Sequence, residues 1–218
     1  MLSPVMEDYL KAVYQLGDDE VRTSELAEHL DVSQPTVTNM LEKLDERGLV
    51  EREKYKGVTL TEEGRTVAVE VVRHHRLIEA YLAEALDYDW SEVHDEADRL
   101  EHHISEEFEE RVAAALDDPE RDPHGAPIPG ADLEPPEEDG ETLDTLEEGD
   151  AVVVERVEDD DAEVLRYLDE HGVVPGAKVE VAEVAPFGMI TVRTDDEEVA
   201  LPDEVARSVV VEAAQKPV

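Results

Sequence analysis

TSELAEHLDVSQPTVTNMLEKLDERGLVEREKYKGVTL, residues 23–60, is the stretch that decides the fold of the N-terminal part of this chain. Thr23 can cap a helix that runs to Leu30. After a short turn, Ser33 can cap a second helix over residues 34–47. A helix, a short turn and a second helix form the helix-turn-helix pattern, which predicts a DNA-reading element.

The residues that follow predict a wing. Residues 49–55 and 58–60 are typical of two short strands, and side chains alternate along a strand, so Arg52 and Lys54 share one face. A winged helix that serves only protein contacts is the alternative. The residues expected to contact DNA are Ser33, Gln34, Pro35, Thr36, Thr38 and Asn39, which would face base edges, and Arg52, Lys54 and Lys56, which would contact phosphates.

The charge of the chain argues against a conventional basic DNA-binding protein. Its 218 residues include 60 acidic and 19 basic side chains, for a net charge of −41. Residues 33–60 are neutral, with five acids and five bases, so this window is the part that can approach a polyanion. Arg outnumbers Lys 13 to 6 and the acids are spread along the chain, which predicts adaptation to high salt.

The composition also limits the cellular compartment in which the protein is expected and the types of metal site that it can form. The chain has no Cys, which excludes disulfides and thiolate metal sites. We find neither a basic-then-apolar leader nor an apolar run of about 18 residues, so we expect a cytoplasmic protein without a membrane span.

Carboxylates and histidines recur at helical spacing in the first half of the chain. A helix that starts near Thr61 would carry His75 and Glu79 one turn apart on a largely apolar face. We expect Ser91 to cap the next helix. The other candidates are Asp8, at the edge of the apolar stripe of a first helix, and His94, Asp98, Glu101 and His102, which share one side of the helix after Ser91.

Such a cluster favours a divalent cation. Two unit charges 4 Å apart repel by about 4 kcal/mol at an effective dielectric constant of 20, and a cation would remove that cost. Oxygen and imidazole donors without thiolates favour Mn(II) or Fe(II) by ligand type. Hydrogen-bonded core histidines and solvated acidic faces are the alternatives.

At these residues the sequence resembles the diphtheria toxin repressor family of metal-dependent transcription repressors. The matching segments are Met6-Glu7-Asp8-Tyr9-Leu10, residues 33–38, Arg65, His75-Arg76-Leu77-Ile78-Glu79, Val93-His94-Asp95-Glu96-Ala97, Glu101-His102 and residues 123–130. The resemblance covers essentially the whole chain. It implies a homodimeric repressor, not an enzyme, that binds a palindromic operator in double-stranded DNA and controls metal homeostasis genes.

The resemblance also implies two metal sites per protomer. The primary site would be Asp8, Asp98, Glu101 and His102, and the ancillary site His75, Glu79 and His94. Lys11 replaces a Glu that the manganese branch uses as a ligand. Asp161 or Glu163 lies near the position from which some members complete the ancillary site.

The predicted fold is mainly α at the N-terminus, with a winged helix-turn-helix and a helical dimerisation domain, and ends in a small all-β SH3-like barrel. The barrel is similar to the ferrous-iron transport A domain. The expected boundaries are 1–64 for the DNA-binding domain, 65–130 for the dimerisation and metal-binding domain, 131–145 for an acidic Pro-rich linker and 146–218 for the barrel.

Two rival functions stay open from the residues alone. His94-Asp95 with the other histidines suggests a metal-dependent phosphohydrolase of the His-Asp type. A winged-helix regulator that responds to an organic ligand is the second rival.

Overall fold

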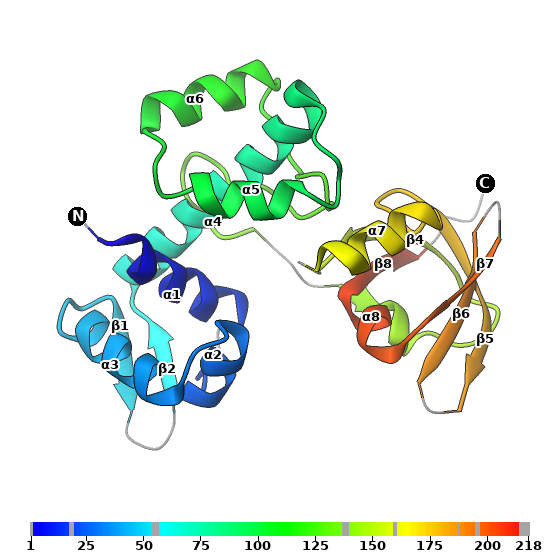
Figure 1. Ribbon diagram of the computed structural model, residues 1–218, viewed down its shortest axis with the longest axis horizontal. Helices are drawn as coiled ribbons and strands as arrows, with labels where there is room; N and C mark the ends of the chain where they lie inside the picture. The colour runs from blue at the N-terminus through cyan, green and yellow to red at the C-terminus, as the bar shows by residue number, and fades with distance from the viewer. Residues whose placement is uncertain are drawn as a thin grey trace. The chain divides into compact units, whose positions relative to one another are not determined.

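The computed structural model describes residues 2–17, 20–53, 57–136, 140–158, 161–186, 188–194 and 197–213. Figure 1 shows its elements, which in chain order are α1 Pro4–Gln15, α2 Thr23–His29, α3 Gln34–Asp45, β1 Val50–Glu53, β2 Gly57–Leu60, α4 Glu62–Leu86, α5 Val93–Leu100, α6 Glu106–Ala115, β3 Glu141–Thr142, the 3-10 helix η1 Leu143–Thr145, β4 Ala151–Val157, α7 Ala162–Glu170, β5 Lys178–Ala185, β6 Met189–Arg193, β7 Glu198–Leu201, α8 Asp203–Ser208 and β8 Val209–Ala213.

The chain divides into two compact units. The first comprises Met1–His75, Leu100–Ser105 and Pro129–Pro136. The second comprises Arg76–Arg99, Glu106–Ile128 and Glu137–Val218. Helix α4 contributes residues to both.

The first unit contains the predicted helix-turn-helix. Leu10 of α1, Leu26 of α2 and Leu44 of α3 are fully buried in one apolar core. Ser33 is the N-cap of α3, as predicted, and its hydroxyl accepts a hydrogen bond from the Thr36 N–H at 3.4 Å. The N-terminus of α3 therefore lies where its capping residue predicts.

The start of α2 differs from the prediction. Thr23 is the first residue of the helix, and Arg22 occupies the N-cap position. The Arg22 backbone N–H donates to the Glu25 side chain at 2.7 Å, so a carboxylate at the third helical position stabilises this end in place of the Thr23 hydroxyl.

The predicted wing is confirmed as an antiparallel pair. β1 and β2 pair with Val50 opposite Leu60 and Arg52 opposite Val58. Val21 forms an isolated bridge with Val58, which adds a third short segment to the wing. Lys54 and Lys56 lie outside the described residues.

Gly64, in the first turn of α4, touches the backbone that leads into the wing. A Cβ added at Gly64 would lie 1.8 Å from the Leu49 carbonyl oxygen, so the backbone would have to shift. Alanine is normally better than glycine inside a helix, by about 1 kcal/mol. We expect Gly64→Ala to reverse this sign and destabilise the protein by about 1–3 kcal/mol in urea unfolding, as overpacked sites do. The exposed neighbour Glu63→Ala is the control, and a Gly64→Ala protein as stable as the parent would contradict the close approach.

The helical part of the second unit packs the C-terminal half of α4 against α6. Its core includes Leu77 and Ala80 of α4 with Val112 and Ala113 of α6. In α5, Val93 and Ala97 are fully buried.

The structure corrects two expectations for α5. The helix begins at Val93, and the Ser91 hydroxyl donates to Asp89 at 2.6 Å, so it does not cap the helix. The helix ends at Leu100, so Glu101 and His102 lie in the turn that follows it and not on its face. The buried contacts of Glu101 described below explain why the chain leaves the helix here.

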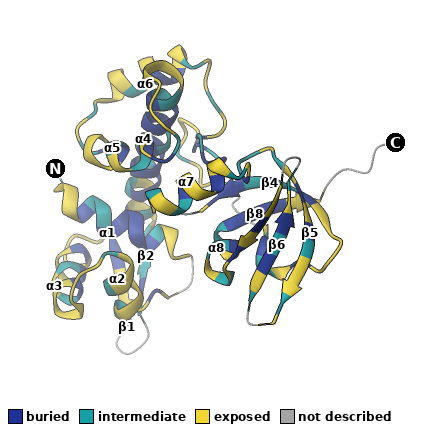
Figure 2. Cartoon of the chain, turned by 45° about the vertical axis from the view of Figure 1, so that its right-hand side comes forward, coloured by how far each residue is buried: buried dark blue, intermediate teal, exposed yellow. Residues whose placement is uncertain are grey.

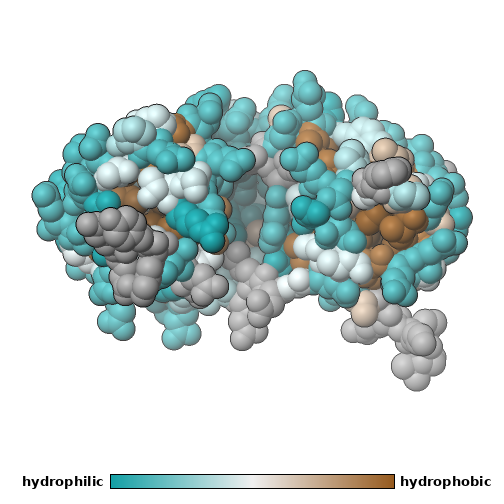
Figure 3. All heavy atoms as spheres, turned by 90° about the horizontal axis from the view of Figure 1, so that it is seen from below, coloured by the Kyte–Doolittle hydropathy of each residue, from teal (hydrophilic) through white to brown (hydrophobic). Residues whose placement is uncertain are grey.

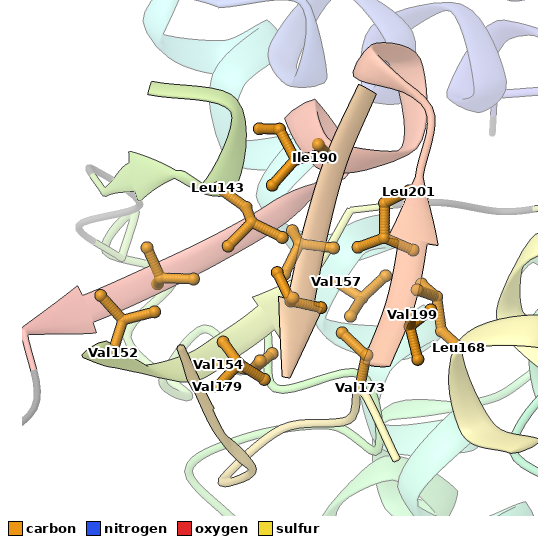
Figure 4. Close-up of a cluster of buried hydrophobic side chains, with 14 of the residues drawn as sticks. Leu143, Val152, Val154, Val157, Leu168, Val173, Val179, Ile190, Val199 and Leu201 are labelled. Carbon is orange, nitrogen blue, oxygen red and sulfur yellow. The ribbon is translucent and has the colours of Figure 1, made fainter. Parts of the chain in front are cut away.

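The second unit also contains a six-stranded antiparallel sheet with strand order β3-β8-β4-β5-β6-β7. Exposed and buried residues alternate along β7, as expected of a strand with one face on a core. The strands β5, β6 and β8 likewise carry both buried and exposed residues (Figure 2). Side chains from several strands converge in that core, among them Val154, Ile190 and Leu201 (Figure 4). The barrel expected to be all-β also includes α7 and α8, because α7 places Leu165 and Leu168 in the same core.

The ordered barrel includes residues ahead of Leu146. β3 pairs with β8, and Leu143 of η1 is fully buried in the barrel core; both elements lie inside the predicted linker 131–145. The boundaries 1–64 and 65–130 stay predictions. Within the described residues, none of the helices combines the length and apolar character that a bilayer span requires. Hydrophilic side chains predominate on the face shown in Figure 3.

Candidate metal centre

In the first unit, three predicted ligands converge. The ligand atoms of Asp8, Glu101 and His102 all lie within 4.8 Å of one another. His102 Nε2 is 2.7 Å from Asp8 Oδ1 and 3.3 Å from Glu101 Oε1. Asp8 comes from α1, whereas Glu101 and His102 come from the turn after α5, so this cluster joins segments more than 90 residues apart. Two oxygens and one imidazole nitrogen are donors suited to Mn(II) or Fe(II).

His102 has a second carboxylate partner, which the sequence analysis did not identify. Its Nδ1 atom lies 2.7 Å from Glu7 Oε2. A carboxylate on the far ring nitrogen is the usual way in which a metal-binding histidine is oriented. Through this contact with Nδ1, the Glu7 carboxylate is positioned to orient the His102 ring. The signal was the pair Glu7-Asp8, since adjacent acids near a helix start offer both groups.

Burial and neighbouring charges shift the pKa values of Asp8 and Glu101 in opposite directions. Burial raises the pKa of Asp8, and the neighbouring His102 only partly offsets it. Burial alone would also raise the pKa of Glu101, but the hydrogen bond with His75 and the charge of Lys11 hold that pKa below its usual value. A cation at the cluster has to compete with a proton for Asp8, so its affinity should fall at acid pH.

The second unit brings together a separate cluster around Glu79. Glu79 is 2% exposed, and its Oε1 atom lies 3.3 Å from His94 Nδ1 and 3.6 Å from His124 Nδ1. Glu79, Asp122 and His124 also offer ligand atoms within 4.8 Å of one another, and all three are buried. Asp122 and His124 were not predicted as ligands. The available signal in the sequence was the histidine inside the Pro-rich segment 123–130.

The segment that carries Asp122 and His124 is held firmly within its unit. His124 Nε2 faces the Trp90 carbonyl at 3.0 Å, and the two rings pack with centroids 5.0 Å apart. Trp90 Nε1 donates to the Pro123 carbonyl at 2.7 Å. The Val157 N–H of β4 donates to the His124 carbonyl at 2.9 Å, so the barrel supports this segment directly.

Burial and the charge of Glu79 raise the pKa of Asp122 to about 6, against the opposing effects of Arg76 and His124. Burial alone would lower the pKa of His124, but its contact with Glu79 raises it. The carboxyl of Asp122 is therefore a costly charge in the metal-free protein at neutral pH.

Asp122→Asn should stabilise the metal-free protein at neutral pH. The folded state holds a proton on Asp122 up to about pH 6, whereas the unfolded value is 3.8, so the contribution of this group to stability falls as pH rises between these values. The unfolding free energy of the variant should exceed that of the parent by on the order of 2 kcal/mol at pH 7.5 and converge with it near pH 4. Urea unfolding at both pH values, with the exposed Asp117→Asn as control, measures this. Equal stabilities of variant and parent at pH 7.5 would show that burial and Glu79 do not raise the pKa of Asp122.

The remaining predicted ligands are placed as follows. Asp98 lies in the second unit, half-exposed, with Oδ2 3.6 Å from His94 Nε2. His75 lies in the first unit, where its Nδ1 atom is 2.6 Å from Glu101 Oε2. Asp161 is the N-cap of α7 and accepts a hydrogen bond from the Glu163 N–H, so its carboxylate has a structural role.

The predicted base-reading residues lie on the exposed side of α3. Gln34, Pro35, Thr36 and Asn39 are exposed and Thr38 is half-buried. Arg52 is exposed, and its guanidinium lies 3.6 Å from Glu42 of α3, so part of its charge is already offset.

Three family descriptions match this chain. "Iron dependent repressor, N-terminal DNA binding domain" matches residues 1–58, "Iron dependent repressor, metal binding and dimerisation domain" matches 61–130, and "FeoA domain" matches 141–213. The chain is 36% identical over 220 residues to the iron-dependent repressor IdeR of Mycobacterium tuberculosis, covering 94% of this chain and 96% of the relative. The chain belongs to the diphtheria toxin repressor family. The resemblance seen in the sequence is therefore confirmed.

Other family members support the same fold. The diphtheria toxin repressor of Corynebacterium glutamicum is 32% identical over 229 residues, with 96% of each chain covered. A solved structure described as a manganese-dependent transcriptional repressor complex with manganese superposes with a TM-score of 0.89 at 39% identity, covering 96% of this chain and all of the other. This member of the family thus carries a DNA-binding domain, a dimerisation domain and a FeoA domain, and is a metal-dependent transcription repressor by membership.

Proposed function

We propose that this chain is a homodimeric repressor that binds a palindromic operator when Mn(II) or Fe(II) occupies its metal sites, and that it controls genes of metal homeostasis. The observation that carries the proposal is the convergence of Asp8, Glu101 and His102 in the unit that also holds the DNA-reading helix α3. The relatives are named for both metals, iron in IdeR and manganese in the solved complex.

The residues present fit two ions per protomer. The first ion would be held by Asp8, Glu101 and His102, to which the family resemblance adds Asp98. The second ion would be held by Glu79 and His94, to which the family resemblance adds His75. The buried Asp122 and His124 beside Glu79 are further donors for that ion. A bound divalent cation would neutralise the carboxylates and hold its ligands at fixed positions relative to one another. This role requires no covalent chemistry.

A cation bound at the first site would favour DNA binding because it restrains helix α1 and, through the shared core, the reading helix α3. Without a cation, Asp8 and Glu101 repel each other and α1 is less firmly held. With one, α1 is tied to the turn after α5. Because Leu10 of α1 and Leu44 of α3 share a core, α3 is restrained together with α1. A palindromic operator requires two reading helices at a fixed separation, so this restraint favours the binding form.

Within the proposed complex, α3 would enter the major groove. Gln34 and Asn39 present amide groups that can read base edges, and Pro35 offers an apolar contact. Arg52, with Lys54 and Lys56, would contact phosphates. Ser33 and Thr38 already use their hydroxyls within the protein, on Thr36 and on the Gln34 carbonyl, so we expect smaller effects from their replacement.

The proposal is tested by a gel shift on the DNA upstream of the gene, at high salt, with Mn(II), Fe(II), Zn(II) or a chelator. We expect a shifted complex with Mn(II) or Fe(II) that the chelator removes. Binding that is insensitive to chelator would favour a regulator of an organic ligand. Turnover of a phosphoester with added Mn(II) would favour the phosphohydrolase. The relatives named above are repressors, which supports the first outcome.

A further inference from the structure

Lys11 is a buried cation beside the first metal cluster. Its side chain is 10% exposed, and its Nζ atom lies 2.8 Å from Glu101 Oε2 and 3.1 Å from His75 Nδ1. The Glu101 side chain is 1% exposed. Lysine rarely lies this deep in a protein without a charge partner, so the pair is a built feature of the unit.

The two oxygens of Glu101 face different partners. Oε2 contacts Lys11 and His75, and Oε1 faces His102 at 3.3 Å on the side of Asp8. A carboxylate of this kind can bridge two cations, one on each oxygen. On the Oε1 side the partners are the imidazole and the carboxylate of the proposed first site. On the Oε2 side, an imidazole nitrogen is present but the place of the second cation is taken by the Lys11 ammonium.

The Lys11 ammonium and a divalent ion cannot both occupy the position between Glu101 Oε2 and His75 Nδ1. The Nζ atom is a hydrogen-bond donor only, and it sits at hydrogen-bond distance from both an imidazole nitrogen and a carboxylate oxygen. A divalent ion would need those same two atoms as ligands and would be repelled by the ammonium at close range.

We propose that Lys11 limits the cluster of Asp8, Glu101 and His102 to a single divalent ion, by occupying the second cation position between Glu101 Oε2 and His75 Nδ1. The inference rests on the proposed function, because it concerns the same cluster. Lys11 is a positioning and selectivity residue: it neutralises one oxygen of Glu101 and leaves the other directed at His102.

The test counts bound Mn(II) in Lys11→Met and Lys11→Glu. Each protein is dialysed against Mn(II) at high salt, and metal per chain is measured by mass spectrometry. Both variants should bind one more ion per chain than the parent. In proteins, two metal ions that act together in one site lie about 3.5–4 Å apart, so the extra ion should also produce a spin-coupled Mn(II) signal in electron paramagnetic resonance. Lys11→Arg, which keeps the charge, and Lys178→Met, which removes an exposed lysine of β5, should match the parent in both measurements.

A second readout covers the case in which Lys11→Met folds poorly without metal. The cation beside the buried Glu101 would be missing, and the extra Mn(II) would replace it, so Mn(II) should raise the melting temperature of Lys11→Met more than that of the parent. Parental ion counts, no spin coupling and a parental response of the melting temperature would overturn the inference.

Asp8→Ala separates the two proposals. If it lowers the ion count of the parent by one while Lys11→Met and Lys11→Glu keep the parental count, the first metal site stands and the role of Lys11 is wrong. If Asp8→Ala leaves the parental count unchanged, the first site itself is wrong and the inference falls with it.

Discussion

Replacing His102 with alanine is expected to abolish metal-stimulated DNA binding while the dimer persists. His102 Nε2 is the atom at which Asp8 and Glu101 converge, so its loss removes the ring nitrogen that both carboxylates contact. Loss of an outer-shell partner typically costs 10–100-fold in metal affinity, so we expect loss of a ligand to weaken Mn(II) binding by at least about 100-fold. At Mn(II) concentrations that saturate the parent, the variant should therefore show no metal-stimulated DNA binding. A gel shift titrated with Mn(II), alongside sedimentation to measure the dimer, gives both quantities.

The chain provides a matched control for this experiment. His103 is the next residue and is exposed, so His103→Ala should respond to Mn(II) like the parent. Asp8→Ala should behave like His102→Ala, because it removes a ligand of the same proposed ion from α1. A His102→Ala protein that keeps the parental Mn(II) response would show that the site assignment is wrong.

Transfer from molar salt to about 10 mM salt is expected to unfold a large part of this protein. The net charge is −41, and residues 109–170 alone carry 24 acids and four bases, a net charge of −20. The screening length grows from about 3 Å in 1 M salt to about 30 Å at 0.01 M, so repulsion among these acids then acts across the whole domain. Far-ultraviolet circular dichroism should show the loss of helix and strand signal, and restoring the salt should recover it.

Two comparisons identify the cause. NaCl and KCl at equal ionic strength should protect the fold equally, because screening depends on ionic strength alone. An equal volume of sucrose solution, which does not screen charge, should protect it far less. A circular dichroism spectrum that is unchanged on desalting would contradict the predicted salt adaptation.

The sequence by itself determined the elements whose signals are local. Ser33 and Pro35 mark the start of α3, and the alternating residues after Gly48 mark the wing, because capping and side-chain periodicity depend on neighbours only a few residues away. The candidates Asp8, Glu79, His94 and His102 were also identifiable, since their residue types recur at helical spacing and match a family pattern.

The tertiary structure alone decided which of these groups meet. Lys11 lies 90 residues from Glu101, and Glu79 lies 45 residues before His124, so no local spacing relates them. The end of α5 at Leu100 is of the same kind, because Glu101 leaves the helix for buried partners on α1 and α4 that outweigh its own helix propensity. Caps and periodicity act over a few residues of the chain, whereas the position of a buried charge is set by every element packed around it.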